Sequence, residues 1–291
     1  MADLRPMEFG EILDGALQLF RRHFGLFLKL SLAVMWLPLA FSIYFRARFF
    51  GLGAVNPQIT AGLLQSEIVP LLLLALVWAV LYGAGMLMLT AGSIRVISDS
   101  YLGREPEFGD SLHFGFSKMV PLFLVAIGKG LLILLIYILC AAVAALTAAA
   151  GGMAILLVVL EVIAGVWLVI YVSCGYMVTT PVVVLETLAS NFDAFGRSWA
   201  LTKGMRGRLF GLVVVAYLIA GFLPSLVLSA VGAIIGQLAP PALFAWTVIA
   251  AVAPVVLTPI VPCVLTLAYY DLRVRHEGFD LQLLSEQLGS I

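Results

Sequence analysis

The sequence predicts an all-α fold: a polytopic membrane helical bundle with about six transmembrane helices. Hydrophobic residues make up 63% of the 291 residues and charged residues only 11%. In a soluble domain about half of the residues are hydrophobic and about a quarter are charged. The mean hydropathy is +1.13, and six apolar stretches are long enough to cross a bilayer. This much apolar surface predicts a chain that is solvated by lipid.

The six apolar stretches define the predicted spans, since about 20 mainly apolar residues cross about 30 Å of hydrocarbon. The third and fourth stretches are separated only by Gly151-Gly152, which predicts a short turn between antiparallel helices. The first stretch follows an acidic segment and lacks a small-residue cleavage site, so we expect it to remain as an anchor. The predicted spans are Gly25–Phe45, Ile68–Ser93, Met119–Ala149, Gly152–Val178, Leu209–Ile235 and Ala242–Tyr270.

The basic residues predict the orientation, because cytoplasmic loops carry an excess of lysine and arginine. Thirteen basic residues fall in the N-terminal segment, the second and fourth loops and the C-terminal segment, and only Arg46 and Arg48 fall in the opposite loops. We therefore expect a multi-pass protein of the inner (plasma) membrane with both termini cytoplasmic. The thirteen are Arg5, Arg21, Arg22, Lys29, Arg95, Arg104, Lys118, Arg197, Lys203, Arg206, Arg208, Arg273 and Arg275.

Similar segments precede the first, third and fifth spans. Each begins with phenylalanine and a small or acidic residue, continues with a short helical pattern, and contains basic residues before the span. In the first, apolar residues recur with helical spacing from Phe9 to Phe24, and acidic residues precede basic ones, as in an amphipathic helix of the headgroup layer. In the third, Ser190 and Asp193 form a predicted capping box. The aromatic anchors expected at the interface are Phe9, Phe20, Phe108, Phe192 and Trp199.

This similarity predicts an internal repeat of three units, each an interfacial helix followed by a helical hairpin. The units cover residues 8–98, 107–188 and 190–275, with a cytoplasmic tail at 276–291, within a single transmembrane domain of residues 1–291. The tail after Gly278 repeats the opening of the units without a span to follow. The alternative explanation is the ordinary alternation of amphipathic loops and spans in polytopic proteins.

No familiar catalytic or metal-binding motif occurs in the sequence. HExxH, GxSxG and Walker-type glycine loops are missing, and cytoplasmic loops of roughly 25–30 residues are too short for a soluble catalytic domain. The net charge of zero argues against a nucleic-acid partner. We therefore expect a chain that is not an enzyme and needs no cofactor, with the lipid bilayer and other membrane proteins as candidate partners.

Two charged residues lie within predicted spans and form the candidate intramembrane polar site. Lys129 lies about ten residues into the third span, where its long side chain can reach back to the cytoplasmic headgroups. Glu161 lies near the middle of the fourth span, and an ionisable group at that depth is a functional candidate by default. Hydrogen bonding to a neighbouring helix is the structural alternative. The two lie about 18 Å apart along the hairpin axis, which argues against a direct ion pair.

Three prolines mark the sixth span as a candidate helix break: Pro254, Pro259 and Pro262. Each removes a backbone hydrogen bond, so the helix is expected to kink or unwind. Broken helices form midplane binding sites in transporters. Prolines are also tolerated in spans for shape alone, which is the alternative.

Three segments resemble the bacterial glycerophosphoryl diester phosphodiesterase membrane-domain family. They are LRPMEFGEILDGALQLFRRHFG at the start, FDAFGRSWALTKGMRGRLFG in the fourth loop and YYDLRVRHEGFDLQLL at the end. The resemblance covers essentially the whole chain and implies a six-span protein of the bacterial inner membrane. Some members of that family also carry a soluble phosphodiesterase barrel, for which this chain has neither the length nor the metal ligands. The resemblance therefore implies no activity and transfers no catalytic residue.

These observations lead to three functional hypotheses. The first is a non-catalytic scaffold or accessory subunit that organises lipids or partner proteins. The second is a transporter or lipid-moving protein that uses Glu161, Lys129 and the proline-broken sixth helix. The third is a membrane-embedded enzyme acting on lipid headgroups. The surroundings of Glu161 discriminate the first two, because a transporter needs it to face a polar cavity.

Overall fold

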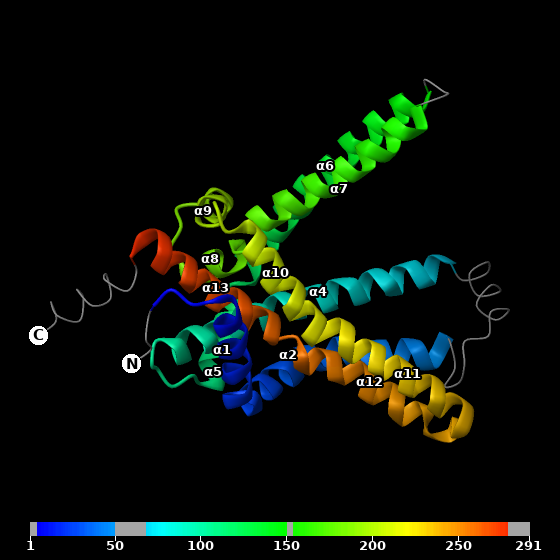
Figure 1. The fold of residues 1–291 in the computed structure, drawn as a ribbon. Helices are drawn as coiled ribbons and strands as arrows, with labels where there is room; N and C mark the ends of the chain where they lie inside the picture. Colours follow the sequence, from blue (N-terminus) through cyan, green and yellow to red (C-terminus); the bar gives the residue numbers. More distant parts are fainter. Residues whose placement is uncertain (1–4, 50–67, 150–153, 279–291) are drawn as a thin grey trace, which may run out of the picture. The chain divides into compact units, whose positions relative to one another are not determined.

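The computed structural model describes residues 5–49, 68–149 and 154–278, and these residues are almost entirely helical, without a strand. The α-helices are α1 (Phe9–Arg22), α2 (Phe24–Phe49), α4 (Ile68–Tyr101), α5 (Phe108–Ser117), α6 (Met119–Ala149), α7 (Ala154–Gly175), α8 (Thr179–Leu185), α9 (Asp193–Leu201), α10 (Arg206–Tyr217), α11 (Leu223–Leu238), α12 (Leu243–Leu257) and α13 (Ile260–Glu277). A π-helix, η1 (Leu218–Phe222), joins α10 to α11, and a 3-10 helix, η2 (Pro240–Ala242), joins α11 to α12 (Figure 1).

Six helical stretches of the described chain are long and apolar enough to cross a membrane, which confirms the predicted all-α, polytopic fold class. The chain is a multi-pass membrane protein. The stretches are Phe24–Tyr44, Leu72–Tyr101, Met119–Ala149, Leu156–Leu185, Arg206–Leu238 and Leu243–Glu277.

The observed helices differ from the predicted spans mainly at their ends. The second and sixth stretches continue as helix to Tyr101 and Glu277, well past the apolar residues, because polar residues extend a helix that the apolar part has already nucleated. The fourth stretch turns after Gly175 and resumes as α8. The predicted turn at Gly151-Gly152 and the tail after Gly278 lie outside the described residues.

The described chain divides into two compact units. The first is built from Gly10–Met119 and Val213–Val264. The second is built from Asp3–Phe9, Val120–Leu212 and the chain from Leu265 onward. Helices α10 and α13 each contribute residues to both.

The first unit packs α2 against α4, and α5 and α12 lie against this pair. Its core contains Leu30, Met35, Leu89 and Val255, and Phe108 at the start of α5 packs on it. Close helix approach is part of this packing. A Cβ at Gly115 of α5 would lie 2.7 Å from the main-chain carbonyl oxygen of Met88 on α4.

We expect Gly115→Ala to destabilise the first unit by about 1–3 kcal/mol, because backbone must move to relieve the overlap with the Met88 carbonyl. Thermal unfolding in a mild detergent measures the effect. Gly109→Ala is the matched control on the same helix, since a Cβ there meets nothing within 4 Å. Equal unfolding temperatures for the two variants would contradict the close packing of α5 on α4.

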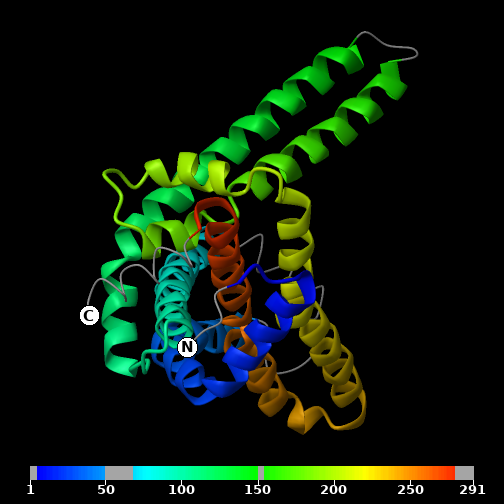
Figure 2. The same cartoon turned by 60° about the vertical axis from the view of Figure 1, so that its left-hand side comes forward.

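The second unit contains the antiparallel pair α6 and α7, which lie side by side in both views (Figures 1 and 2). Cys140 of α6 and Gly165 of α7 face each other, since a Cβ at Gly165 would lie 3.1 Å from the Cys140 sulfur. The apolar 18-residue stretch of each helix has no buried residue. Most of the surface of this hairpin is therefore free for lipid or for another protein.

Candidate functional site

Glu161 has one hydrogen-bond partner among the described residues. The hydroxyl of Thr147, on the facing helix α6, donates to Glu161 Oε1 at 2.8 Å. The other carboxyl oxygen, Oε2, is shielded and meets no donor in the described chain. The carboxyl group is therefore held between the two helices of one hairpin.

Lys129 lies at a different level of the same hairpin. Its Nζ donates to the main-chain carbonyl of Tyr176 at 3.4 Å, directly after the end of α7. The 22 residues of α7 rise about 33 Å, close to the thickness of the hydrocarbon layer. Lys129 thus lies at the C-terminal end of α7, where its positive charge is favourable.

The three prolines interrupt the sixth stretch without unwinding it over any length. Pro254 lies inside α12, which ends at Leu257, and α13 begins at Ile260 directly after Pro259. Pro262 falls in the first turn of α13, where a missing backbone N–H costs little. All three belong to the first unit, whereas Glu161 belongs to the second.

The predicted interfacial anchors have different surroundings. Phe20 is buried and stacks on Phe27 at 5.7 Å, so its ring packs against protein. Ile12 and Ala16 are buried on the same face of α1. Phe9 is exposed over 38% of its surface, and its ring approaches Gly211.

The start of α9 shows part of the predicted capping box. The Asp193 carboxylate accepts from the Ser190 main-chain N–H at 2.8 Å. The Ser190 hydroxyl accepts from Phe192, at 3.3 Å, whereas the box expects Asp193 as that donor. One half of the reciprocal pair is therefore present.

A continuous series of aromatic rings connects α7 with α9 in the second unit. Successive ring centroids lie 5.2 to 6.3 Å apart. Tryptophan and tyrosine concentrate where helices cross the boundary between hydrocarbon and water, and this series lies at the end of α7. The rings belong, in contact order, to Trp167, Tyr171, Trp199, Tyr176, Phe195 and Phe192.

Backbone contacts hold α9 at the end of α7. The hydroxyls of Ser198 and Thr202 both donate to the carbonyl of Gly175, at 2.8 and 3.2 Å. A Cβ at Gly175 would lie 2.3 Å from the ring of Trp199. Glycine is therefore the residue that allows Trp199 to pack closely against the last turn of α7. Arg206, the first residue of α10, lies over the same ring at 3.7 Å.

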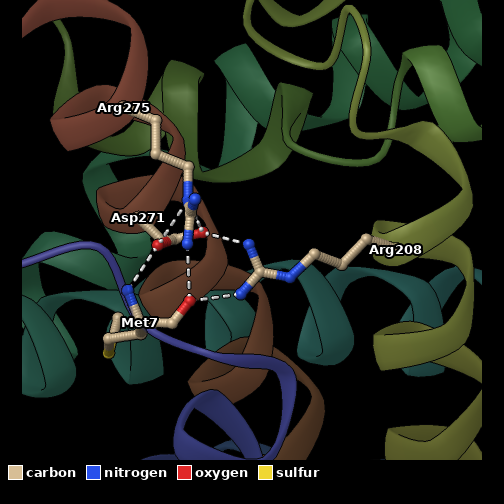
Figure 3. Close-up of polar contacts among 4 residues, drawn as sticks. All are labelled: Met7, Arg208, Asp271 and Arg275. Carbon is tan, nitrogen blue, oxygen red and sulfur yellow. Dashed lines mark hydrogen bonds and ion pairs between the residues drawn. The ribbon is translucent and has the colours of Figure 1, made fainter.

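A buried carboxylate, Asp271 on α13, joins three segments that are distant in sequence (Figure 3). Its side chain is 3% exposed and accepts from Arg208 of α10 at 2.9 Å and from Arg275 at 3.0 Å. It also accepts from the main-chain N–H of Met7 at 2.8 Å. The Met7 carbonyl accepts from both guanidinium groups. This Asp271 cluster fastens the N-terminal segment between α10 and α13.

A second polar cluster connects α13 with the segment between α8 and α9. Glu186 accepts from Arg197 at 2.9 Å and from the hydroxyl of Tyr269 at 2.8 Å. Glu277 pairs with Arg197 and with Arg273. Hydrogen bonding to Glu277, and also to Glu186, raises the pKa of Arg197 above its ordinary value, although partial burial opposes this. Arg197 therefore stays charged between its two carboxylates.

Helical spacing on α13 allows one helix to serve both clusters. Asp271 and Arg275 are four residues apart and share one face, and Tyr269, Arg273 and Glu277 share another. This explains why α13 continues so far past the apolar part of the sixth span. The polar end of α13 contacts the N-terminal segment, α10 and the segment between α8 and α9.

The sequence pattern indicates Arg208 and Arg275 only as loop charges, and it does not indicate Asp271 as a site residue. An acidic residue at the end of an apolar span, followed by arginine four residues later, was the available signal.

The two polar clusters are suited to a structural role, since each of their carboxylates forms an ion pair with arginine. Among the described residues, no group of three or more histidine, cysteine, aspartate or glutamate side chains could hold a metal ion. Comparison with models of known families, with curated proteins and with solved structures found no match to the chain.

Proposed function

We propose that the chain is a non-catalytic scaffold or accessory subunit that organises lipids or partner proteins in the bacterial inner membrane, with both termini cytoplasmic. The exposed hairpin of α6 and α7 carries this proposal. The most apolar 18 residues of each helix include no buried residue, and large side chains such as Leu139 and Trp167 are 57% and 63% exposed. A surface of this kind is available to acyl chains or to helices of a partner.

The polar clusters support the same proposal, because their charges are used within the chain. Asp271, Glu186 and Glu277 each pair with arginine, which leaves none of them as an obvious acid or base. The surroundings of Glu161 also favour a scaffold, since it is held by one partner, Thr147, on the adjacent helix. The resemblance to the glycerophosphoryl diester phosphodiesterase membrane-domain family is part of this proposal. It is compatible with a scaffold because it implies no catalytic activity.

Transport is the second candidate function, and one observation favours it. Glu161 Oε2 is shielded without a donor, and a shielded carboxyl oxygen without a partner is a site where a proton or ion can bind. A transporter would lose flux in Glu161→Gln, because the amide cannot release a proton. Reconstituted vesicles with a panel of solutes and lipids measure this flux, with Thr147→Val as the variant that keeps the carboxyl group.

Photo-crosslinking tests the scaffold proposal in native membranes. A photoreactive residue replaces Leu139 or Trp167 on the exposed hairpin, and a second variant carries it at the buried Val125 as the matched control. We expect reproducible protein adducts, or enrichment of particular lipids, at the exposed positions only. Adducts that are the same at Val125, or that show neither partner nor lipid selectivity, would contradict a scaffold. Flux that Glu161→Gln abolishes would favour transport instead.

The bond between Thr147 and Glu161 predicts a modest contribution to stability. We expect Thr147→Val to destabilise the hairpin by about 0.6 kcal/mol, the average for interhelical hydrogen bonds inside membranes. Unfolding in mixed detergent measures the loss. Thr247→Val is the control, because its hydroxyl donates only to Leu243 on its own helix. If both variants behave alike, the interhelical bond contributes nothing.

A further inference from the structure

Arg206 is a cation without a counter-ion among the described residues. Its guanidinium lies 3.7 Å from the ring centroid of Trp199 and 4.4 Å from that of Tyr171. Its Nε is buried and has no hydrogen-bond partner there. Four other arginines of the second unit pair with carboxylates: Arg197, Arg208, Arg273 and Arg275.

Lys129 is a second cation on the same aromatic layer. Its hydrogen bond goes to the carbonyl of Tyr176, whose ring lies 5.3 Å from that of Trp199. The end of a helix supplies about half a negative charge, which does not neutralise two cations.

The depth of this pair corresponds to the headgroup layer. The length of α7 matches the hydrocarbon thickness, and both cations lie near its end at Gly175. The rings from Tyr171 to Phe192 lie near the same level. Directly beside it, Trp167 exposes 63% of its surface, so an apolar face adjoins the two charges.

We propose that Arg206 and Lys129 bind the phosphate of an anionic phospholipid, whose acyl chains lie along the exposed face of α7. The two rings hold the guanidinium group, so its terminal N–H groups are preorganised for the planar, two-point recognition of phosphate that arginine favours. The ammonium of Lys129 adds a point charge. The proposal rests on the scaffold function and specifies the lipid class that it organises.

Lipid retention by the purified full chain tests this. Palmitoyl-oleoyl phosphatidylglycerol and the corresponding phosphatidylcholine are titrated into the protein in dodecyl maltoside, and native mass spectrometry counts retained lipid. We expect Arg206→Gln and Lys129→Gln each to weaken phosphatidylglycerol binding about fivefold. Phosphatidylcholine binding should weaken less, because its choline cation offsets the charge of the phosphate. Lys203→Gln is the matched control, because it removes one exposed charge from the turn before α10. It should change binding less than about twofold.

Several outcomes would overturn the proposal. Equal losses of phosphatidylglycerol binding in Lys203→Gln and Arg206→Gln would mean diffuse electrostatic attraction. Unchanged phosphatidylglycerol binding in both Arg206→Gln and Lys129→Gln would mean that the two residues form no lipid site. Displacement of phosphatidylglycerol by inorganic phosphate at equal concentration would mean a site for free phosphate.

A second measurement covers the case in which Arg206→Gln does not fold. In a protein with Trp199 as its only tryptophan, brominated phosphatidylglycerol should quench its fluorescence more than brominated phosphatidylcholine, and equal quenching would contradict the site. The crosslinks from Leu139 do not require Arg206. A missing lipid site and a missing scaffold function are therefore distinguishable.

Discussion

Replacing Asp271 by asparagine is expected to destabilise the protein by about 3–5 kcal/mol, the range for breaking a buried ion pair from one side. The carboxylate is 3% exposed and neutralises part of the charge of Arg208 and Arg275. Asparagine would leave two adjacent cations facing each other. It would also weaken the bond from the Met7 N–H, so the N-terminal segment should detach first.

Thermal unfolding and limited proteolysis of the N-terminal segment measure these two effects. Asp99→Asn is the matched control, because Asp99 has one ion pair among the described residues, with Arg95 on the same helix. Ion pairs between residues four apart on one helix contribute about 0.2–0.5 kcal/mol. A loss in Asp271→Asn no larger than that of the control would contradict the central position of the Asp271 cluster.

Gly175→Ala is expected to cost about 1–3 kcal/mol, the range for overpacking a filled site. The added methyl group would lie 2.3 and 2.4 Å from two ring carbons of Trp199. Hydrogen bonds from the hydroxyls of Ser198 and Thr202 to the Gly175 carbonyl hold α9 in place, so the ring has little freedom to withdraw. Displacing Trp199 would also separate it from Arg206.

Unfolding temperature and the emission of Trp199 as the only tryptophan report the two consequences. Gly130→Ala on α6 is the control, since a Cβ there meets nothing within 4 Å, and alanine favours a helix over glycine by up to about 1 kcal/mol. A Gly175→Ala protein as stable as the control, with unchanged emission, would contradict the packing of α9 on α7.

Local pattern was sufficient to predict the helices and insufficient to predict the polar clusters. Apolar length identifies a span regardless of what it contacts, so the predicted spans overlap all six observed stretches. Helix ends such as Tyr101 and Glu277 depend on polar residues that either helix or coil accommodates. Glu161 was identifiable because a charge inside an apolar stretch stands out, whereas its partner Thr147 is an unremarkable hydroxyl at a spacing that only the hairpin register determines.

Composition and hydropathy by themselves determined that this is a multi-pass helical membrane protein, because lipid imposes apolar length on any chain that crosses it. Only the tertiary structure decided which charged side chains are paired with other groups of the chain. Asp271 meets Met7 and Arg208 across more than 200 and 60 residues of sequence, respectively, and no local pattern encodes such pairing. The same folding leaves Arg206 on an aromatic layer with no carboxylate beside it in the described chain, and from this the lipid site is inferred.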